Sequence, residues 1–190
     1  MTFPVLPIVM PSDLDGHTNG RLPGELLRAL KSTRGEMHHR AAAAFNCLQV
    51  EAFFAGIDLQ SVGTYRSYGA QVLLFNDRYS STPTLRIPPV TRRWNNKTYW
   101  LKRGKAPAAT PGTSNHGWGL AIDIAHANGE RLAWMLGPHP LLSPVVKYGF
   151  SWEVESGPNA EPWHIRYVCG DEWPPAVEEA LKLFPDLVAE

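Results

Sequence analysis

The chain contains 190 residues, of which 44% are hydrophobic and 11% aromatic. That is enough for one domain with a sizeable core and too little for a second full domain. Its 18 Lys and Arg residues balance its 18 Asp and Glu residues, so the composition gives no overall attraction to nucleic acid or to a membrane surface. We expect no nucleic-acid partner and no membrane partner, and we expect the chain to be a monomer.

The N-terminal part divides into an arm and the start of a domain. Residues 1–22 are broken by proline and glycine and predict an extended arm, with neither the basic segment of a signal peptide nor the length of a membrane span. A domain is expected over residues 23–173. Pro23 and the leucines after it predict a short helix ending near Gly35, and apolar residues at helical spacing predict the main scaffold helix over residues 36–55.

The middle of the chain combines regular elements with a basic segment. A strand over residues 59–65 is expected to bring Arg66 to its end, and a helix follows over residues 70–79. Residues 80–113 contain no acidic side chain. We interpret them as a long loop or short hairpin beside the cleft. Two roles are equally favoured: the segment contacts substrate, or it is a solvent-exposed loop whose aromatic side chains cover the core. This segment interleaves Arg92, Arg93, Lys97, Lys102, Arg103 and Lys105 with Trp94, Tyr99 and Trp100.

The C-terminal half alternates short strands with short helices. Strands are expected over 120–125, over 150–154 and from His164 onward. Helices are expected over 129–136, before Gly149, and over 175–183, the last within a segment, 174–190, that is a cap or the start of a linker. The elements predict an α+β fold, with a small, mostly antiparallel sheet packed by helices and the site on the open sheet face.

A histidine and a carboxylate gather at the strand over 120–125. Alternation puts Asp123 on a face otherwise occupied by alanine, and glycines just before the strand let His116 fold back toward Asp123. Such a pair can share a hydrogen bond, form half of a catalytic relay, or supply two ligands of a metal ion. The pair alone does not decide between these roles.

A second polar segment downstream supplies another imidazole and a spare acid. Catalytic zinc takes three protein ligands and leaves a fourth position for water, a count that His116, Asp123 and His164 fill. Glu161 is then the natural general base, because a nearby carboxylate must take the proton of the attacking water. Pro162 biases Glu161 toward an extended conformation, so Glu161 and His164 reach one site only if the chain bends there.

Three ordered motifs resemble the D-alanyl-D-alanine carboxypeptidase (VanY-like) family of zinc peptidases, of the M15 peptidase type, which includes phage endolysin peptidase domains. The motifs are Tyr65-Arg66-Ser67 followed by Gln71, the segment from Ser114 to Asp123, and Glu161-Pro162-Trp163-His164. The likeness covers about residues 20–170. It implies a fold like that of the Hedgehog and D,D-peptidase group.

The resemblance also implies an activity and a set of roles. One zinc ion would be bound by His116, Asp123 and His164, with Glu161 and Arg66 as the catalytic residues. Substrate contacts are implied for Tyr65, Arg66, Gln71, Ser114 and Trp163. The implied reaction is hydrolysis of peptide bonds between D-amino acids in peptidoglycan stem peptides, by a D-Ala-D-Ala carboxypeptidase or a D,D-endopeptidase. The enzyme would act at the bacterial cell wall, either released at lysis as a phage lysin or as a domain of a longer protein.

Three other functions stay open. An L-Ala-D-Glu endopeptidase would use the same metal with a different cleft, although the Glu-Pro-Trp-His form favours the D,D-peptidases. A non-catalytic wall-binding module would bind zinc only to stabilise its fold. Structural zinc sites tend to have four protein ligands, however, whereas this site has three and an additional acid, Glu161, that is not needed as a ligand. Nucleic-acid binding through residues 92–105 predicts affinity for oligonucleotides that falls steeply with salt.

Overall fold

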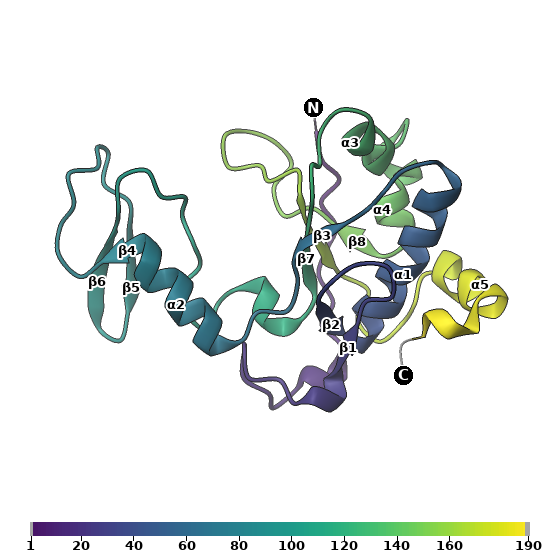
Figure 1. The fold of residues 1–190 in the computed structure, drawn as a ribbon, viewed down its shortest axis with the longest axis horizontal. Coiled ribbons are helices and arrows are strands. Elements are labelled where there is room, and N and C mark those ends of the chain that lie inside the picture. Colours follow the sequence, from purple (N-terminus) through teal and green to yellow (C-terminus); the bar gives the residue numbers. More distant parts are fainter. Residues whose placement is uncertain (1, 189–190) are drawn as a thin grey trace.

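A four-stranded antiparallel sheet forms the centre of the protein (Figure 1). The computed structural model describes residues 2–188. The strands are β3 (Ser61–Gly63), β7 (Ala121–Ile124), β9 (His164–Tyr167) and β8 (Phe150–Ser151), in the order β3-β7-β9-β8. Each neighbouring pair is antiparallel. The expected α+β fold with a small antiparallel sheet is therefore confirmed.

Helices pack against this sheet and close the main core. The longest is α1 (His39–Phe54), in which ten of 16 residues are buried, and its Phe45 ring lies edge-on to Phe150 of β8 with 6.1 Å between centroids. The helix α5 (Pro175–Leu183) packs on α1, while α3 (Gly129–Leu136) packs on α4 (Pro144–Lys147). Short 3-10 helices complete the regular structure at Ser12–Leu14, Gly24–Leu26, Asn115–Trp118, Pro140–Leu142 and Pro185–Leu187.

The prediction of a helix after Pro23 is wrong. The chain makes only the 3-10 turn at Gly24–Leu26 and then forms the strand β1 (Leu27–Ala29), which pairs antiparallel with β2 (Glu36–His38). The backbone N–H of Leu30 donates to the carbonyl of Gly35 and closes the hairpin. Strand pairing thus overrides the helix propensity of the leucine-rich run. The scaffold helix begins three residues later than expected, because Glu36 to His38 belong to the hairpin.

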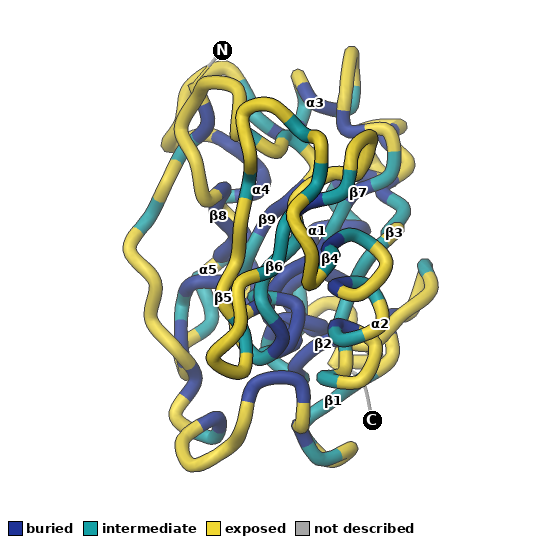
Figure 2. The backbone as a smooth tube through the Cα atoms, turned by 90° about the vertical axis from the view of Figure 1, so that its left-hand side faces the viewer, coloured by how far each residue is buried: buried dark blue, intermediate teal, exposed yellow. Residues whose placement is uncertain are grey.

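The basic segment forms a second, smaller sheet. The strands are β4 (Tyr79–Ser80), β6 (Lys97–Leu101) and β5 (Thr91–Trp94), in the order β4-β6-β5, and α2 (Tyr68–Arg78) leads into them. Figure 1 shows this unit at one side of the main sheet, and Figure 2 shows that its strand β5 is largely exposed whereas most of α1 is buried. Its own small core stacks Phe75 on Tyr79, with ring centroids 4.6 Å apart. The expected hairpin is present and gains a third strand.

The N-terminal arm lies along the main domain. Phe3 is buried against Trp152, and Val9 forms an isolated parallel bridge with Cys169. Cys169 and Cys47 are both free thiols. None of the helices described between residues 2 and 188 is long and apolar enough to cross a membrane.

Candidate metal centre

The three side chains predicted to bind a metal ion converge in the structure. His164 Nδ1 lies 2.8 Å from Asp123 Oδ1, and His116 Nε2 lies 3.4 Å from Asp123 Oδ2. One ligand atom from each residue lies within 4.8 Å of the other two. The carboxylate therefore stands between two imidazole nitrogens, close enough for all three groups to bind one ion.

Strand pairing and two close backbone contacts bring these side chains together. Asp123 of β7 is the register partner of His164 in β9, and Gly63 of β3 pairs with Asp123 from the other side. A Cβ atom on Gly63 would stand 2.7 Å from Asp123 Oδ2, so the carboxylate fills the space left by the glycine. The 3-10 turn carrying His116 ends at Gly119, whose φ of 66° is costly for other residues.

In each of the two histidines, the ring nitrogen that points away from Asp123, called the outer nitrogen below, has a partner of its own. His116 Nδ1 lies 2.8 Å from the carbonyl oxygen of Thr64, and His164 Nε2 lies 3.5 Å from Glu153 Oε1. With an ion bound, a proton held at each outer nitrogen would leave the lone pairs of His116 Nε2 and His164 Nδ1 for the metal. Metal-binding histidines are typically oriented in this way. The residues present therefore fit a zinc ion with three protein ligands.

The charges at the site favour a bound cation. Burial opposes ionisation of Asp123, but hydrogen bonds from His116 and His164 outweigh it and hold the Asp123 pKa below its ordinary value. Burial also opposes protonation of His164, yet Asp123 and Glu153 raise its pKa to about 9. Two carboxylates thus stabilise a positive charge at the position of the His164 ring.

Arg66 lies at the edge of this centre and is held in place by Gln71. The backbone N–H of Arg66 donates to the His116 carbonyl, and its Nη1 donates to Gln71 Oε1 at 3.0 Å. Gln71 is 2% exposed, and its Nε2 donates to the carbonyl of Ala109. Burial lowers the Arg66 pKa, and the charge of Asp123 opposes that shift. Both polar atoms of the Gln71 amide are therefore engaged inside the protein.

Replacing Gln71 by alanine is expected to lower kcat/KM by about tenfold, because Arg66 loses a charge-assisted hydrogen bond worth about 1.5 kcal/mol or more. Zinc content should stay unchanged, since Gln71 contacts none of the three metal-binding side chains. Steady-state kinetics and metal analysis measure the two effects. Gln60→Ala is the matched control, because the Gln60 amide contacts only Asp58 at the surface. Equal kinetics in both variants would contradict a role for Gln71 in holding Arg66.

The remaining predicted site residues lie in differing surroundings. Glu161 is exposed, and its side chain has no hydrogen-bond or ion-pair partner among residues 2–188, while its carbonyl accepts from the His164 N–H at 3.0 Å. This turn supplies the bend that the sequence requires at Pro162. Tyr65 Oη accepts from the Leu22 N–H, and Ser114 is buried with its carbonyl bound to Asn19.

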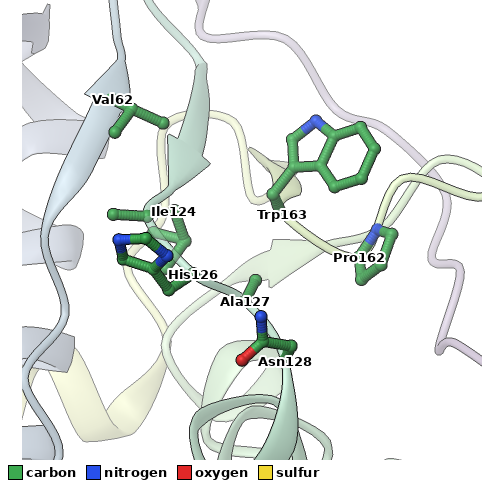
Figure 3. A pocket seen from close by; sticks show the side chains of 8 residues that line it. Val62, Ile124, His126, Ala127, Asn128, Pro162 and Trp163 are labelled. Carbon is green, nitrogen blue, oxygen red and sulfur yellow. The ribbon is translucent and has the colours of Figure 1, made fainter.

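Trp163 lines an open pocket beside the centre. Its side chain is 43% exposed and stands over Pro162, with Val62 and His126 on the other wall (Figure 3). The lining does not include His116, Asp123 or His164, the three residues predicted to bind a metal ion. A substrate contact by Trp163 would therefore be made away from the point where the three ligand atoms meet.

Two residues at the centre, Glu153 and Asn115, were not predicted from the sequence. Glu153 follows β8 and reaches His164, and the Asn115 side-chain amide donates to the same Glu153 oxygen. The hydrogen bond from His164 is the main cause that lowers the Glu153 pKa. The available signal was the register of β8 with β9, since continuing it two residues beyond Ser151 places Glu153 opposite His164.

A second cluster of similar composition lies at the start of α1. Asp13 Oδ1 lies 2.9 Å from His38 Nε2, and Asp13 Oδ2 lies 2.6 Å from His39 Nε2. The outer nitrogen of His38, Nδ1, is buried and has no hydrogen-bond partner among the described residues. A metal on Nε2 would force the proton onto that unpartnered nitrogen. We interpret this cluster as a clamp of hydrogen bonds that ties the N-terminal arm to α1.

The clamp predicts a pH-dependent stability. Burial is the main cause that lowers the His38 pKa to about 4, so the unfolded chain, with an ordinary value of about 6.5, binds the proton more tightly. The stability contribution is therefore complete above about pH 6.5 and is lost as the pH falls toward 4. From this residue we expect an unfolding free energy about 2 kcal/mol lower at pH 5 than at pH 7.

Denaturant titrations of the wild type and of His38→Gln at pH 7 and pH 5 measure this effect. Glutamine keeps a donor for Asp13 and removes the titrating ring, so the difference between the two pH values should shrink by about that amount. An unchanged difference would show that His38 does not titrate in this range.

The fold is the one expected for the family that the sequence motifs indicate, and comparison with known proteins agrees. The family model of VanY, D-alanyl-D-alanine carboxypeptidase, matches residues 34–170. The chain therefore belongs to the VanY family of D-alanyl-D-alanine carboxypeptidases, as the sequence motifs indicate.

Individual relatives are more distant. A Bacillus subtilis (strain 168) protein named "Putative carboxypeptidase YodJ" is 30% identical over 67% of this chain and 45% of its own length, so the chain spans less than half of that relative. Among solved structures, VanYB in complex with D-alanine-D-alanine is 18% identical, with a TM-score of 0.51 over 94% of this chain and 91% of that chain. The LD-carboxypeptidase LdcB is 22% identical, with a TM-score of 0.52 over 86% and 76%. These two structures share the fold.

Proposed function

We propose that the protein is a zinc-dependent peptidase that hydrolyses peptide bonds between D-amino acids in peptidoglycan stem peptides. The observation that carries this proposal is the convergence of His116, Asp123 and His164, with both histidines oriented by acceptors at their outer nitrogens. Family membership supports the choice of substrate class. One zinc ion per monomeric chain is expected.

The chain's own residues divide the chemistry between them. When bound, a zinc ion with an open position would supply Lewis acidity toward a water molecule and a substrate carbonyl. Glu161 lies three residues before His164 on an exposed turn, where its carboxylate can take a proton from water and return it to the leaving amine. Arg66, fixed by Gln71, opposes the negative charge that develops on the carbonyl oxygen.

Substrate contacts are proposed for Tyr65 and Ser114 at the centre and for Trp163 in the adjoining pocket. All three belong to the motifs shared with the family: Tyr65 directly precedes Arg66, and Ser114 and Trp163 lie within two residues of His116 and His164. We assign Gln71 to holding Arg66 rather than to a direct contact, because it is 2% exposed and both its amide oxygen and its amide nitrogen have partners inside the protein. An enzyme with this substrate acts at the bacterial cell wall, whether it arrives by release at lysis or as part of a longer protein.

Mass spectrometry of purified muropeptides after digestion tests the proposal. A D-Ala-D-Ala carboxypeptidase removes one terminal D-alanine from a pentapeptide stem, and a D,D-endopeptidase separates cross-linked stems. Cleavage between L-Ala and D-Glu would identify the alternative endopeptidase. Zinc binding without any cleavage of muropeptides would favour the non-catalytic wall-binding module.

A further inference from the structure

We propose that Glu153 is a positioning residue that orients His164 for metal binding. The inference rests on the zinc-binding part of the proposed function and adds a residue outside the three motifs. Its basis is geometric: Glu153 Oε1 lies 3.5 Å from His164 Nε2, the nitrogen that points away from Asp123. The ring thus spans two carboxylates, one at each nitrogen.

With a metal ion bound at Asp123, Glu153 would determine which nitrogen of His164 carries the proton. An imidazole in its neutral form has one N–H and one lone pair, and a carboxylate at Nε2 accepts the N–H. The lone pair for the ion would then be at Nδ1, which lies 2.8 Å from Asp123 Oδ1 and next to His116. A carboxylate at the outer nitrogen also makes the histidine a more basic ligand.

Glu153 is itself held in place. The side-chain amide of Asn115 donates to the same Oε1 atom that faces His164. Asn115 directly precedes the metal-binding His116 at the start of a 3-10 turn. Asn115 and Glu153 therefore link the turn that carries His116 to the outer nitrogen of His164.

Glu153 and Glu161 are two carboxylates that precede His164 in the chain, and their contacts assign them different roles. Glu153 is engaged by Asn115 and by the outer nitrogen of His164, on the side of the ring opposite the metal-binding nitrogen. Glu161 has no such partner among residues 2–188 and is free to contact a water molecule. Loss of Glu153 should therefore weaken zinc binding, whereas loss of Glu161 should slow the chemical step.

Zinc affinity, measured by competition with a chromogenic chelator, is the direct test. Glu153→Ala is expected to bind zinc about 10–100-fold more weakly than the wild type. Glu153→Gln should recover part of that loss, because its amide oxygen still accepts the Nε2 proton. Glu155→Ala, an exposed acid in the same loop, is the matched control and should bind zinc like the wild type. Thermal melts of the metal-free variants check that each one folds.

Turnover at saturating zinc separates the possible roles. With the ion loaded, Glu153→Ala should keep kcat within about tenfold of the wild type. This decrease is far smaller than the one expected for a missing general base. Unchanged zinc affinity in Glu153→Ala would overturn the inference, and so would a large kcat loss that zinc does not restore. If the wild type itself binds no zinc at His116, Asp123 and His164, the proposed function fails as well.

Discussion

Glu161→Ala is expected to retain one zinc ion per chain and to lose about 100- to 10,000-fold in kcat, the range typical for removal of a general base. The loss follows from chemistry rather than folding, because the Glu161 side chain is exposed and has no partner among the described residues. Release of D-alanine from a purified pentapeptide muropeptide measures kcat, and elemental analysis measures zinc.

Two further variants sharpen this experiment. Glu172→Ala removes another exposed acid from the C-terminal part and should leave kcat unchanged. Glu153→Ala at saturating zinc should also remain active, which distinguishes the two carboxylates near the site. Retained turnover in Glu161→Ala would remove this residue from the mechanism.

His116→Ala is expected to have the second large effect, a loss of zinc affinity of more than about 100-fold. Removing only an outer partner of a metal-binding histidine costs about 10–100-fold, and removing the ligand itself must cost more. Two ligand atoms would remain, Asp123 Oδ1 and His164 Nδ1, 2.8 Å apart. Chelator competition measures the affinity, and activity should fall in parallel with bound zinc.

His39, in the clamp at the start of α1, offers a matched control for His116→Ala. His39→Ala also removes an imidazole that contacts an aspartate, here Asp13, but its zinc affinity should equal that of the wild type. Full zinc occupancy in His116→Ala would contradict the ligand assignment. Loss of zinc in His39→Ala would instead place an ion at the clamp.

The centre could be predicted from the sequence because its parts follow short-range rules. Alternation in β7 put Asp123 opposite its apolar neighbours, and the turn before it carried His116. The pairing of Asp123 with His164 in neighbouring strands then needed only one antiparallel register. The family likeness of three ordered motifs implied the same three ligands without giving that register.

Other features depend on pairing that no local pattern reveals. Residues after Pro23 read as a helix because their leucines have helical spacing, but β1 is held by pairing with β2. Glu153 was missed because its role depends on the register of β8 with β9. The sequence places Gln71 in a helix but does not show whether its side chain faces solvent or the site. Only the folded structure shows that its amide oxygen accepts a hydrogen bond from Arg66.

A crystal structure of the zinc-loaded protein, with anomalous scattering measured at the zinc edge, tests the central claim most directly. We expect one strong anomalous peak per chain, about 2.0–2.2 Å from His116 Nε2, an Asp123 oxygen and His164 Nδ1, with a fourth position free of protein ligands. A peak between Asp13, His38 and His39 alone, or a fourth protein ligand that closes the site, would contradict it.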